Sequence, residues 1–463
     1  MLNLFRENNK KLNPGDVVIC DDMVRLASKA HDTRVVFPAD ARLLNTLVAG
    51  PAGAGKTSEV ILPMVAQDVQ NPDWGMTILA GNDELPIRAY LLAKESGREA
   101  LYFDPTHKNC PKFNPLAGRE MDVVENIVTA FATLNPDAPQ FFKDLDEQLL
   151  RNAVKVLKRL DKAEGVEGKY ATLINLRQLL QNSAGQGREM VNNFSRIQAA
   201  TEPEAAENRD IAAWFLNDYF TEDSKIFANT SGIRSQVTKL LSFDALRVAL
   251  NPNFDAGEKN ELDFEKVLQA GAVLCITSCE WAFHDLSKYL ANFILLAFKT
   301  AIYRRRQRCI HNSENLRPHI LYINELRTPA MSCLSDVYVN SRDLKVGMVM
   351  TIQALGELSV GGRREDLNFA EVVRSNSRNV ILFPGISKED ATYYTKEHFG
   401  VEQPTVSALM FAGFKNVHYS ICVGQPGEQT LSLGKTRPLS AETYRKLDDA
   451  AKKYEAANSL PDD

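Results

Sequence analysis

Two kinds of hydrophobic pattern alternate along this chain. Short blocks of consecutive apolar residues are typical of strands buried on both faces, whereas longer segments with an apolar residue at every third or fourth position are typical of helices packed on a sheet. The blocks occur at residues 43–49, 76–81, 99–105, 272–278, 319–325, 347–353 and 379–385. Because helical segments separate most of these blocks, the sequence predicts an α/β fold with a mainly parallel sheet. Toward the carboxyl end it also predicts a helix at 388–400 and a short strand at 418–424.

The helical pattern takes over completely in the middle of the chain, where Gly and Pro mark the ends of successive helices. These predicted helices cover residues 141–160, 170–182, 187–197, 205–220 and 232–243. We therefore predict a sheet domain in two parts, residues 1–135 and 244–440, with an inserted all-α domain at 136–243 and a C-terminal tail at 441–463. The last residues of this tail, 447–463, have the pattern of a polar helix that frays at its end.

Composition and charge exclude some classes of protein. The chain has 463 residues, of which 44% are hydrophobic and 24% charged, as expected of a globular protein with a buried core. Its formal net charge of −5 provides no general attraction for nucleic acid, so nucleic-acid binding would need a local basic patch or a ring of subunits. No run of about 18 apolar residues predicts a membrane span, and the polar first residues do not resemble a signal peptide.

The seven cysteines are scattered and form no C-x-x-C pair. Cys275 and Cys279 lie in an apolar block, so we interpret them as residues of a buried strand and its end rather than as metal ligands. This usage fits a reducing compartment, and we expect a cytoplasmic protein.

One motif carries a clear chemistry: the sequence GPAGAGKTS follows an apolar block and precedes a helical pattern. It matches G-x-x-x-x-G-K-T, the phosphate-binding P-loop, whose glycines let backbone N–H groups turn toward an anion. A chance match of small residues is the alternative, and the order strand, loop, helix disfavours it. The predicted nucleotide-binding residues are Gly50, Gly53, Ala54, Gly55, Lys56, Thr57 and Ser58, with Lys56 reaching the β- and γ-phosphates and Thr57 binding Mg²⁺.

An NTPase of this class also needs a carboxylate beside Mg²⁺ and a second one that polarises the attacking water. The buried block at 319–325 ends in Asn324 and Glu325. Glu325 is the candidate for activating water, and Asn324 occupies the position of a metal-binding Asp, where an uncharged amide should lower the affinity for Mg²⁺. The simpler alternative is that Glu325 only ends a strand.

Two further polar residues have suggestive positions. Gln353 ends the next buried block, where a polar group can sense the γ-phosphate. Arg342 lies between the two blocks, and an Arg presented across a subunit boundary can stabilise charge in a neighbouring site. Neither residue is diagnostic on its own, because polar residues end most strands and a solvated Arg is common.

Several stretches together resemble the TraG-like type IV coupling proteins, the ATPases of bacterial conjugation and type IV secretion. The resemblance covers about residues 43–400 and rests on the P-loop segment GPAGAGKTSEVILPM, on YFDPTHKNCPKFNPLAG and FFKDLDEQLLRNAVKVL, on ILYINE, on SRDLKVGMVMTIQALGEL and on SNSRNVILFPGISKEDATYYTKEHFG.

The resemblance implies a RecA-like P-loop NTPase domain that carries an all-α domain and assembles as a hexameric ring. It implies ATP and Mg²⁺ as cofactors, Glu325 as the catalytic carboxylate, Gln353 as the γ-phosphate sensor and Arg342 as the finger supplied in trans. It further implies that the ring receives a relaxase–DNA or protein substrate, with the all-α domain as the receiving face, and works with other type IV secretion ATPases.

The sequence departs from the family pattern in three ways. Asn324 replaces the usual Asp before the catalytic Glu, and the segment 80–85 lacks the first Asp and the Lys of an Asp-x-Lys-Gly-Glu-Leu stretch. Both departures put turnover in question more than nucleotide binding. Most members also begin with transmembrane helices. Here we expect either a trimmed chain or a naturally soluble protein recruited to the inner face of the cytoplasmic membrane by a separate membrane-anchored partner, and we favour the second.

Two other functions remain open at this point. A ring-shaped DNA translocase of the HerA/FtsK kind would share the P-loop and Gln353, although the helical insertion argues against it. A nucleotide-dependent adaptor that binds ATP with weak or no hydrolysis is the other alternative, and Asn324 favours it.

Overall fold

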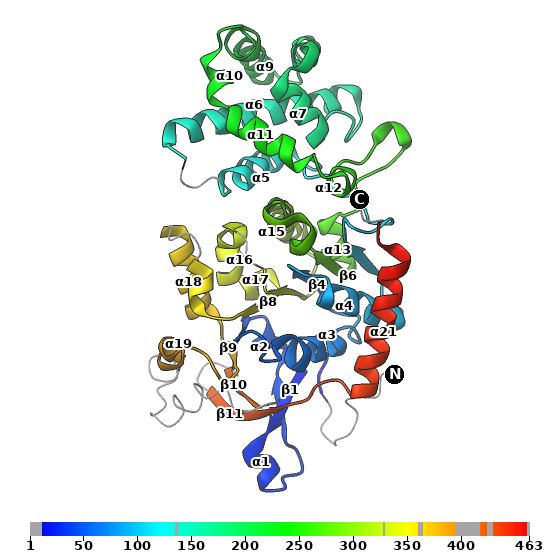
Figure 1. Ribbon diagram of the computed structural model, residues 1–463, viewed down its shortest axis with the longest axis vertical. Helices are drawn as coiled ribbons and strands as arrows, with labels where there is room; N and C mark the ends of the chain where they lie inside the picture. Colours follow the sequence, from blue (N-terminus) through cyan, green and yellow to red (C-terminus); the bar gives the residue numbers. More distant parts are fainter. Residues whose placement is uncertain are drawn as a thin grey trace. The chain divides into compact units, whose positions relative to one another are not determined.

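In the computed structural model, eleven strands form one sheet (Figure 1). The structure describes residues 12–134, 138–326, 329–359, 364–394, 417–423 and 429–460. The strand order is β2-β1-β11-β10-β9-β3-β8-β7-β4-β6-β5. The strands are β1 (Val17–Asp22), β2 (Arg34–Phe37), β3 (Thr46–Ala49), β4 (Gly75–Ala80), β5 (Ala100–Phe103), β6 (Val273–Thr277), β7 (His319–Asn324), β8 (Val346–Ile352), β9 (Asn379–Leu382), β10 (Val417–Val423) and β11 (Gln429–Thr436).

The seven strands from β9 to β5 pair only in parallel with one another, which confirms the predicted α/β class with a mainly parallel sheet. Every residue of β3, β4, β6, β7, β8 and β9 is buried, because helices cover both faces of a parallel sheet. The other four strands extend the sheet in antiparallel fashion beyond β9. The seven apolar blocks of the sequence thus correspond to the seven parallel strands.

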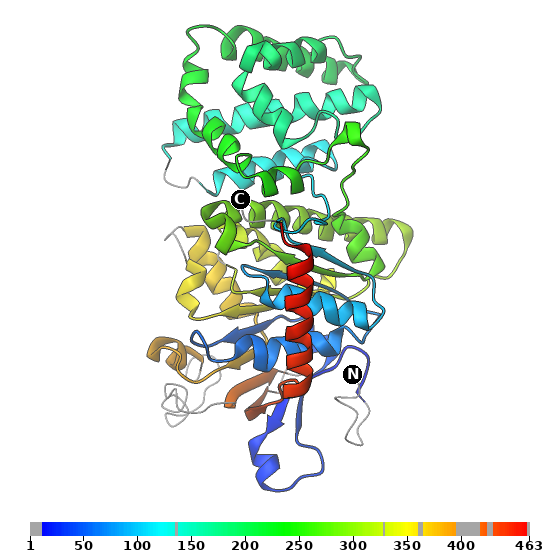
Figure 2. The same ribbon diagram turned by 45° about the vertical axis from the view of Figure 1, so that its right-hand side comes forward.

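Helices connect these strands, and Figure 2 shows α21 in front of α4, on which it packs. The helices around the sheet are α1 (Met23–Ala27), α2 (Ala39–Arg42), η1 (Lys56–Ile61), α3 (Leu62–Asp68), α4 (Glu84–Glu95), α13 (Phe264–Ala270), α14 (Glu280–Phe283), η6 (Pro329–Leu334), α16 (Ser335–Val339), α17 (Ser341–Leu344), η7 (Leu355–Ser359), α18 (Arg364–Asn376), α19 (Lys388–Thr392) and α21 (Ala441–Asn458). The first part of the helix predicted at 388–400 is thus α19, and residues 395–400 lie outside the described ranges.

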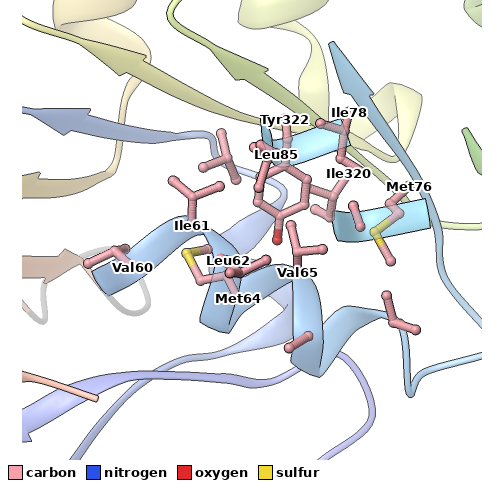
Figure 3. Packing of buried hydrophobic residues seen from close by; sticks show 14 of the residues in the cluster. Val60, Ile61, Leu62, Met64, Val65, Met76, Ile78, Leu85, Ile320 and Tyr322 are labelled. Carbon is pink, nitrogen blue, oxygen red and sulfur yellow. The ribbon is translucent and has the colours of Figure 1, made fainter. Parts of the chain in front are cut away.

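One hydrophobic cluster joins the helix after the P-loop to the strands beneath it (Figure 3). Val60, Ile61 and Met64 come from η1 and α3, and Ile78 and Ile320 come from β4 and β7. Each of these side chains is at most 1% exposed. Burial of such side chains contributes about 1.5–3 kcal/mol each, so the cluster holds the P-loop helix firmly against the sheet.

A buried ion pair lies within this cluster. The Arg42 guanidinium donates to Asp68 Oδ1 at 2.7 Å and to Asp68 Oδ2 at 2.6 Å, and the Tyr322 hydroxyl donates to Asp68 Oδ2 at 2.5 Å. Burial and the neighbouring Asp68 carboxylate raise the pKa of Tyr322 well above its ordinary value, so the phenol stays protonated. These contacts tie α2, α3 and β7 together.

The C-terminal segment forms the polar helix that the sequence predicted, and this helix packs on another helix of the sheet domain. Helix α21 begins at Ala441, where Ser440 caps its N-terminus, and packs on α4. Arg88 of α4 donates to Asp448 at 2.6 Å, and the Tyr454 ring packs 5.5 Å from the ring of Tyr90. An apolar face of α21, spaced at intervals of three or four residues, packs against the hydrophobic cluster and consists of Tyr444, Leu447, Ala451 and Tyr454.

The chain divides into two compact units. Unit 1 comprises residues 1–104, 265–282 and 301–463, and unit 2 comprises residues 105–264 and 283–300. In its described residues, unit 2 contains helices and no strand. It includes the predicted insertion at 136–243 and extends beyond that insertion at both ends. Its helices are α5 (Glu120–Ala132), α6 (Gln140–Glu164), α7 (Leu173–Gln181), η2 (Ser183–Gly185), α8 (Gln186–Phe194), α9 (Glu202–Trp214), η3 (Phe215–Tyr219), α10 (Lys225–Asn229), α11 (Ser231–Leu240), α12 (Asp244–Ala249), η4 (Phe254–Ala256), η5 (His284–Leu286) and the first part of α15 (Ser287–Asn312).

Buried polar contacts stabilise the inside of unit 2. The Arg159 guanidinium, 6% exposed, donates to Glu120, to Glu207 and to Asn208 Oδ1. Asp161 accepts hydrogen bonds from the backbone N–H groups of Gly168 and Tyr170, at 2.8 and 2.6 Å, and so fixes the turn after α6.

Among the described residues, no helix is both long and apolar enough to cross a membrane.

Candidate functional site

The P-loop connects β3 to η1 and adopts the backbone that its glycines predict. Gly53 and Gly55 have φ values of +72° and +91°, in the left-handed region that favours glycine. Gly50 lies where a Cβ atom would come within 2.5 Å of Phe383 Cβ, so a side chain cannot fit at the start of the loop. Ala54 is a half-buried residue of the same loop, and Ser58 is a half-buried residue of η1. The loop is therefore shaped by steric requirements at three glycines.

Lys56 begins η1 and is 3% exposed. Its Nζ atom donates to the carbonyl oxygens of Gly50 and Pro51 at 2.9 and 3.1 Å. The same atom forms an ion pair with Glu325 Oε1 at 3.4 Å. The predicted phosphate-binding cation and the predicted catalytic carboxylate are thus neighbours, although 269 positions separate them in the sequence.

A second set of contacts joins the P-loop to β7. The Thr57 hydroxyl donates to Asn324 Oδ1 at 3.3 Å. Asn324 is the last residue of β7 and is 2% exposed. The residue predicted to bind Mg²⁺ and the residue in place of the usual Asp therefore touch each other directly.

Strand pairing explains this convergence. In the parallel sheet, Ala80 of β4 and Thr351 of β8 both pair with Asn324, and Ala49 of β3 pairs with Ile352. The carboxyl ends of these strands consequently meet at one edge, which is where ligands bind in open α/β sheets. Gln353 directly follows Ile352, and Gly50, the first residue of the P-loop, directly follows Ala49. Because Ala49 pairs with Ile352, Gln353 lies level with the start of the P-loop. Its backbone N–H donates to Glu357 Oε2 at 2.9 Å, which fixes the turn after β8.

Arg342 is not part of this cluster. It is an exposed residue of α17, which precedes β8, whereas Asn324 and Glu325 lie level with the end of β8. The seven residues of β8 span about 20 Å, so the structure places Arg342 at the opposite edge of the sheet from the P-loop of the same chain.

The donor atoms at this edge fit Mg²⁺ only in part. The Thr57 hydroxyl supplies an oxygen atom, which this cation prefers, whereas Asn324 Oδ1 already accepts hydrogen bonds from Thr57 and Thr351. Among the described residues, no group of three His, Cys, Asp or Glu side chains could hold a metal ion. Binding of Mg²⁺ would therefore depend on Thr57 and on phosphate oxygens of a nucleotide.

Thr351 also belongs to the site, although the sequence did not identify it as a candidate site residue. Its hydroxyl donates to Asn324 Oδ1 at 3.0 Å and accepts from the Glu325 backbone N–H at 2.9 Å. A sequence signal existed, because Thr351 is the polar residue within the otherwise apolar segment Met348–Ile352. Glu59 was also missed. Its carboxylate accepts from the Thr436 hydroxyl at 2.8 Å and so connects η1 to β11.

The two cysteines singled out in the sequence lie elsewhere in the sheet. Cys275 is buried within β6, and burial raises the pKa of its thiol. Cys279 follows that strand and donates from Sγ to Asp104 Oδ1 at 3.2 Å. Burial, together with the Asp104 carboxylate, raises the pKa of Cys279 well above its ordinary value, so neither group is a reactive thiolate.

Comparison with known proteins places the fold in a defined class. No family model and no curated protein matches the sequence. Among solved structures, the plasmid coupling protein TrwB in complex with the non-hydrolysable GTP analogue GDPNP is similar, with a TM-score of 0.58 and 15% identity over 95% of this chain and 97% of that chain. VirB4 of Thermoanaerobacter pseudethanolicus is also similar, with a TM-score of 0.55 and 13% identity over 94% of this chain and all of that chain.

The chain therefore has the RecA-like P-loop NTPase fold, with a mainly parallel sheet and a helical unit. The resemblance to type IV coupling proteins that the sequence indicated is confirmed at the level of the fold.

Proposed function

We propose that this protein is the coupling ATPase of a bacterial conjugative type IV secretion system, which binds ATP and Mg²⁺ and recruits a relaxase–DNA or protein substrate to the translocation channel. One observation carries the proposal. Lys56, Thr57 and Glu325 converge with Asn324 at the carboxyl edge of a sheet whose fold is shared with TrwB along 95% of the chain. A chance P-loop match would not bring a buried lysine and a carboxylate together across the loop.

The residues divide the chemistry as follows. Lys56 neutralises charge on the β- and γ-phosphates, and the backbone N–H groups of the P-loop hold the phosphate oxygens. When bound, Mg²⁺ would neutralise further phosphate charge beside Thr57 and Asn324. Glu325 orients the attacking water, and its present ion pair with Lys56 must open to do so. Gln353, next to the P-loop through strand pairing, senses the γ-phosphate.

Arg342 supports a ring of subunits. Because it lies at the opposite edge of the sheet from the P-loop of its own chain, a catalytic role for Arg342 requires a second copy. A homo-hexamer in which each Arg342 serves a neighbouring site satisfies this requirement. In the same proposal, unit 2 receives the substrate, other type IV secretion ATPases cooperate with the ring, and a separate membrane-anchored partner recruits it to the inner face of the cytoplasmic membrane.

One observation favours a second candidate, a soluble adaptor that binds nucleotide with weak or no hydrolysis. Asn324 carries no charge, so the end of β7 supplies one carboxylate, Glu325, where efficient NTPases have two. A HerA/FtsK-like DNA translocase would share the P-loop and Gln353, and strand unwinding would distinguish it from both candidates.

The decisive experiment is steady-state hydrolysis of ATP and GTP by the full-length chain, with and without single-stranded DNA. Lys56→Ala is the test variant, and Lys446→Ala is the matched control because Lys446 is an exposed residue of α21, away from the P-loop and from unit 2. DNA-stimulated turnover that is lost only in Lys56→Ala supports a motor. Nucleotide binding without turnover under all conditions favours the adaptor, and strand unwinding favours the translocase. Co-purification of the full chain with a relaxase then distinguishes coupling from plain translocation.

A further inference from the structure

One hydroxyl group at the site makes two structurally important contacts. Thr351 is 4% exposed and lies at the end of β8. Its Oγ1 atom accepts a hydrogen bond from the Glu325 backbone N–H at 2.9 Å and lies 3.0 Å from Asn324 Oδ1. The same side chain is therefore attached both to the residue that would activate water and to the residue in the metal position.

The number of hydroxyl protons fixes which atom donates and which accepts in these hydrogen bonds. A threonine hydroxyl has a single proton to donate. Because Thr351 Oγ1 accepts from the Glu325 N–H, its own proton is free to go to Asn324 Oδ1. Thr57 donates its proton to the same amide oxygen, at 3.3 Å. Asn324 Oδ1 thus accepts twice, which holds the carboxamide in one orientation and leaves the lone pairs of Thr57 available for a cation.

The backbone of Glu325 requires support of this kind. Its φ value is +51°, in the left-handed region that a non-glycine residue adopts at a cost. The hydrogen bond from its N–H to Thr351 fixes the backbone at the point where the chain leaves β7. The carboxylate that pairs with Lys56 at 3.4 Å is therefore positioned through Thr351.

We propose that Thr351 is a positioning residue of this site. By fixing the Asn324 carboxamide it holds the lone pairs of Thr57 toward the cation, and by fixing the Glu325 backbone it directs the Glu325 carboxylate toward water. This inference rests on the proposed nucleotide-binding function. The proposed role belongs to the hydroxyl group of Thr351 and not to the volume of its side chain. Valine tests this distinction, because it fills nearly the same space in a buried strand but can neither donate nor accept a hydrogen bond.

The chain offers a matched control for loss of a buried threonine hydroxyl. Thr46 lies in the neighbouring strand β3, is fully buried, and its Oγ1 has no hydrogen-bond partner among the described residues. We would compare Thr351→Val, Thr351→Ser and Thr46→Val with the unaltered chain. The affinity for a fluorescent ATP analogue is measured in EDTA and in Mg²⁺, and turnover is measured in parallel.

We expect Thr351→Val to bind the analogue in EDTA within twofold of the unaltered chain. The gain in affinity on adding Mg²⁺ should fall about threefold to tenfold, as for loss of one or two hydrogen bonds, and any turnover should fall at least about tenfold. Thr351→Ser, which keeps the hydroxyl, and Thr46→Val should both match the unaltered chain within about twofold.

Two results would overturn this inference and leave the proposed function standing. In the first, nucleotide binding depends on Lys56, but Thr351→Val behaves like Thr46→Val. In the second, Thr351→Val loses the same affinity in EDTA as in Mg²⁺, which indicates a general structural role. Absence of Lys56-dependent nucleotide binding in the unaltered chain would instead overturn the proposed function, and this inference with it.

Discussion

Lys56 Nζ lies 3.4 Å from Glu325 Oε1, and this ion pair closes the P-loop over the end of β7. The lysine is also bonded to the carbonyl oxygens of Gly50 and Pro51, so its charge is satisfied entirely by the protein. An incoming phosphate group must compete with these three partners. Nucleotide binding and release of the Glu325 carboxylate are therefore expected to be coupled.

Replacing Lys56 should abolish nucleotide binding. Lys56→Ala removes the cation that faces the phosphates and leaves Glu325 without its partner, so affinity for ATP should fall by at least about a hundredfold, as when a buried charge partner is lost. Equilibrium binding of a fluorescent ATP analogue measures this effect. The exposed Lys446→Ala variant should bind normally, and unchanged affinity in Lys56→Ala would contradict the site assignment.

Restoring a carboxylate at position 324 should improve use of the metal. In Asn324→Asp, the side-chain oxygen can still accept from Thr57 and Thr351, and the added charge attracts the cation. We expect the Mg²⁺ concentration for half-maximal turnover to fall by at least about tenfold. A Mg²⁺ titration of ATP hydrolysis tests this. Lower activity in the variant would mean that the site is built around the amide.

The buried ion pair beneath the P-loop helix should matter strongly for stability. Asp68→Asn leaves the Arg42 guanidinium, 1% exposed, without a charged partner, and loss of one member of a buried pair costs about 3–5 kcal/mol. Thermal and denaturant unfolding measure the effect. Glu202→Gln, which removes one member of the exposed Arg209–Glu202 pair, is the control and should cost less than about 1 kcal/mol. Equal shifts in both variants would contradict the argument.

One carboxyl group in unit 2 should make stability depend on pH. Burial raises the pKa of Asp146 to about 6 from an ordinary value of 3.8, an effect that Arg234 only partly offsets. Because the folded state binds this proton more tightly than the unfolded state, the group stabilises the fold below about pH 4, and this contribution is lost as the pH rises to about 6.

The matching substitution is Asp146→Asn, which keeps the shape without the charge. After discounting for partial exposure, we expect it to raise the free energy of unfolding near pH 7 by about 1 kcal/mol and to flatten the dependence between pH 4 and 6. Thermal unfolding at several pH values measures both effects. Asp144→Asn, an exposed carboxylate on the same helix, is the control, and an identical pH profile in both variants would refute the assignment.

The sequence by itself determined the local features of this protein. The seven apolar blocks became the seven parallel strands, because burial on both faces of a sheet requires continuous apolar runs. The loop from Gly50 to Ser58 was predictable because its glycines satisfy local steric demands. Helical spacing likewise identified α6, α7, α8, α9 and α11 within unit 2.

Only the tertiary structure decided which distant residues meet. Thr57 and Asn324 are 267 positions apart, and Asp68 and Tyr322 are 254 positions apart, so their contacts depend on the order and register of strands. Helical spacing could not show that unit 2 extends beyond 136–243, nor that α21 docks on α4. Thr351 escaped notice because a single hydroxyl in an apolar strand becomes informative only when the parallel register sets it beside Asn324 and Glu325.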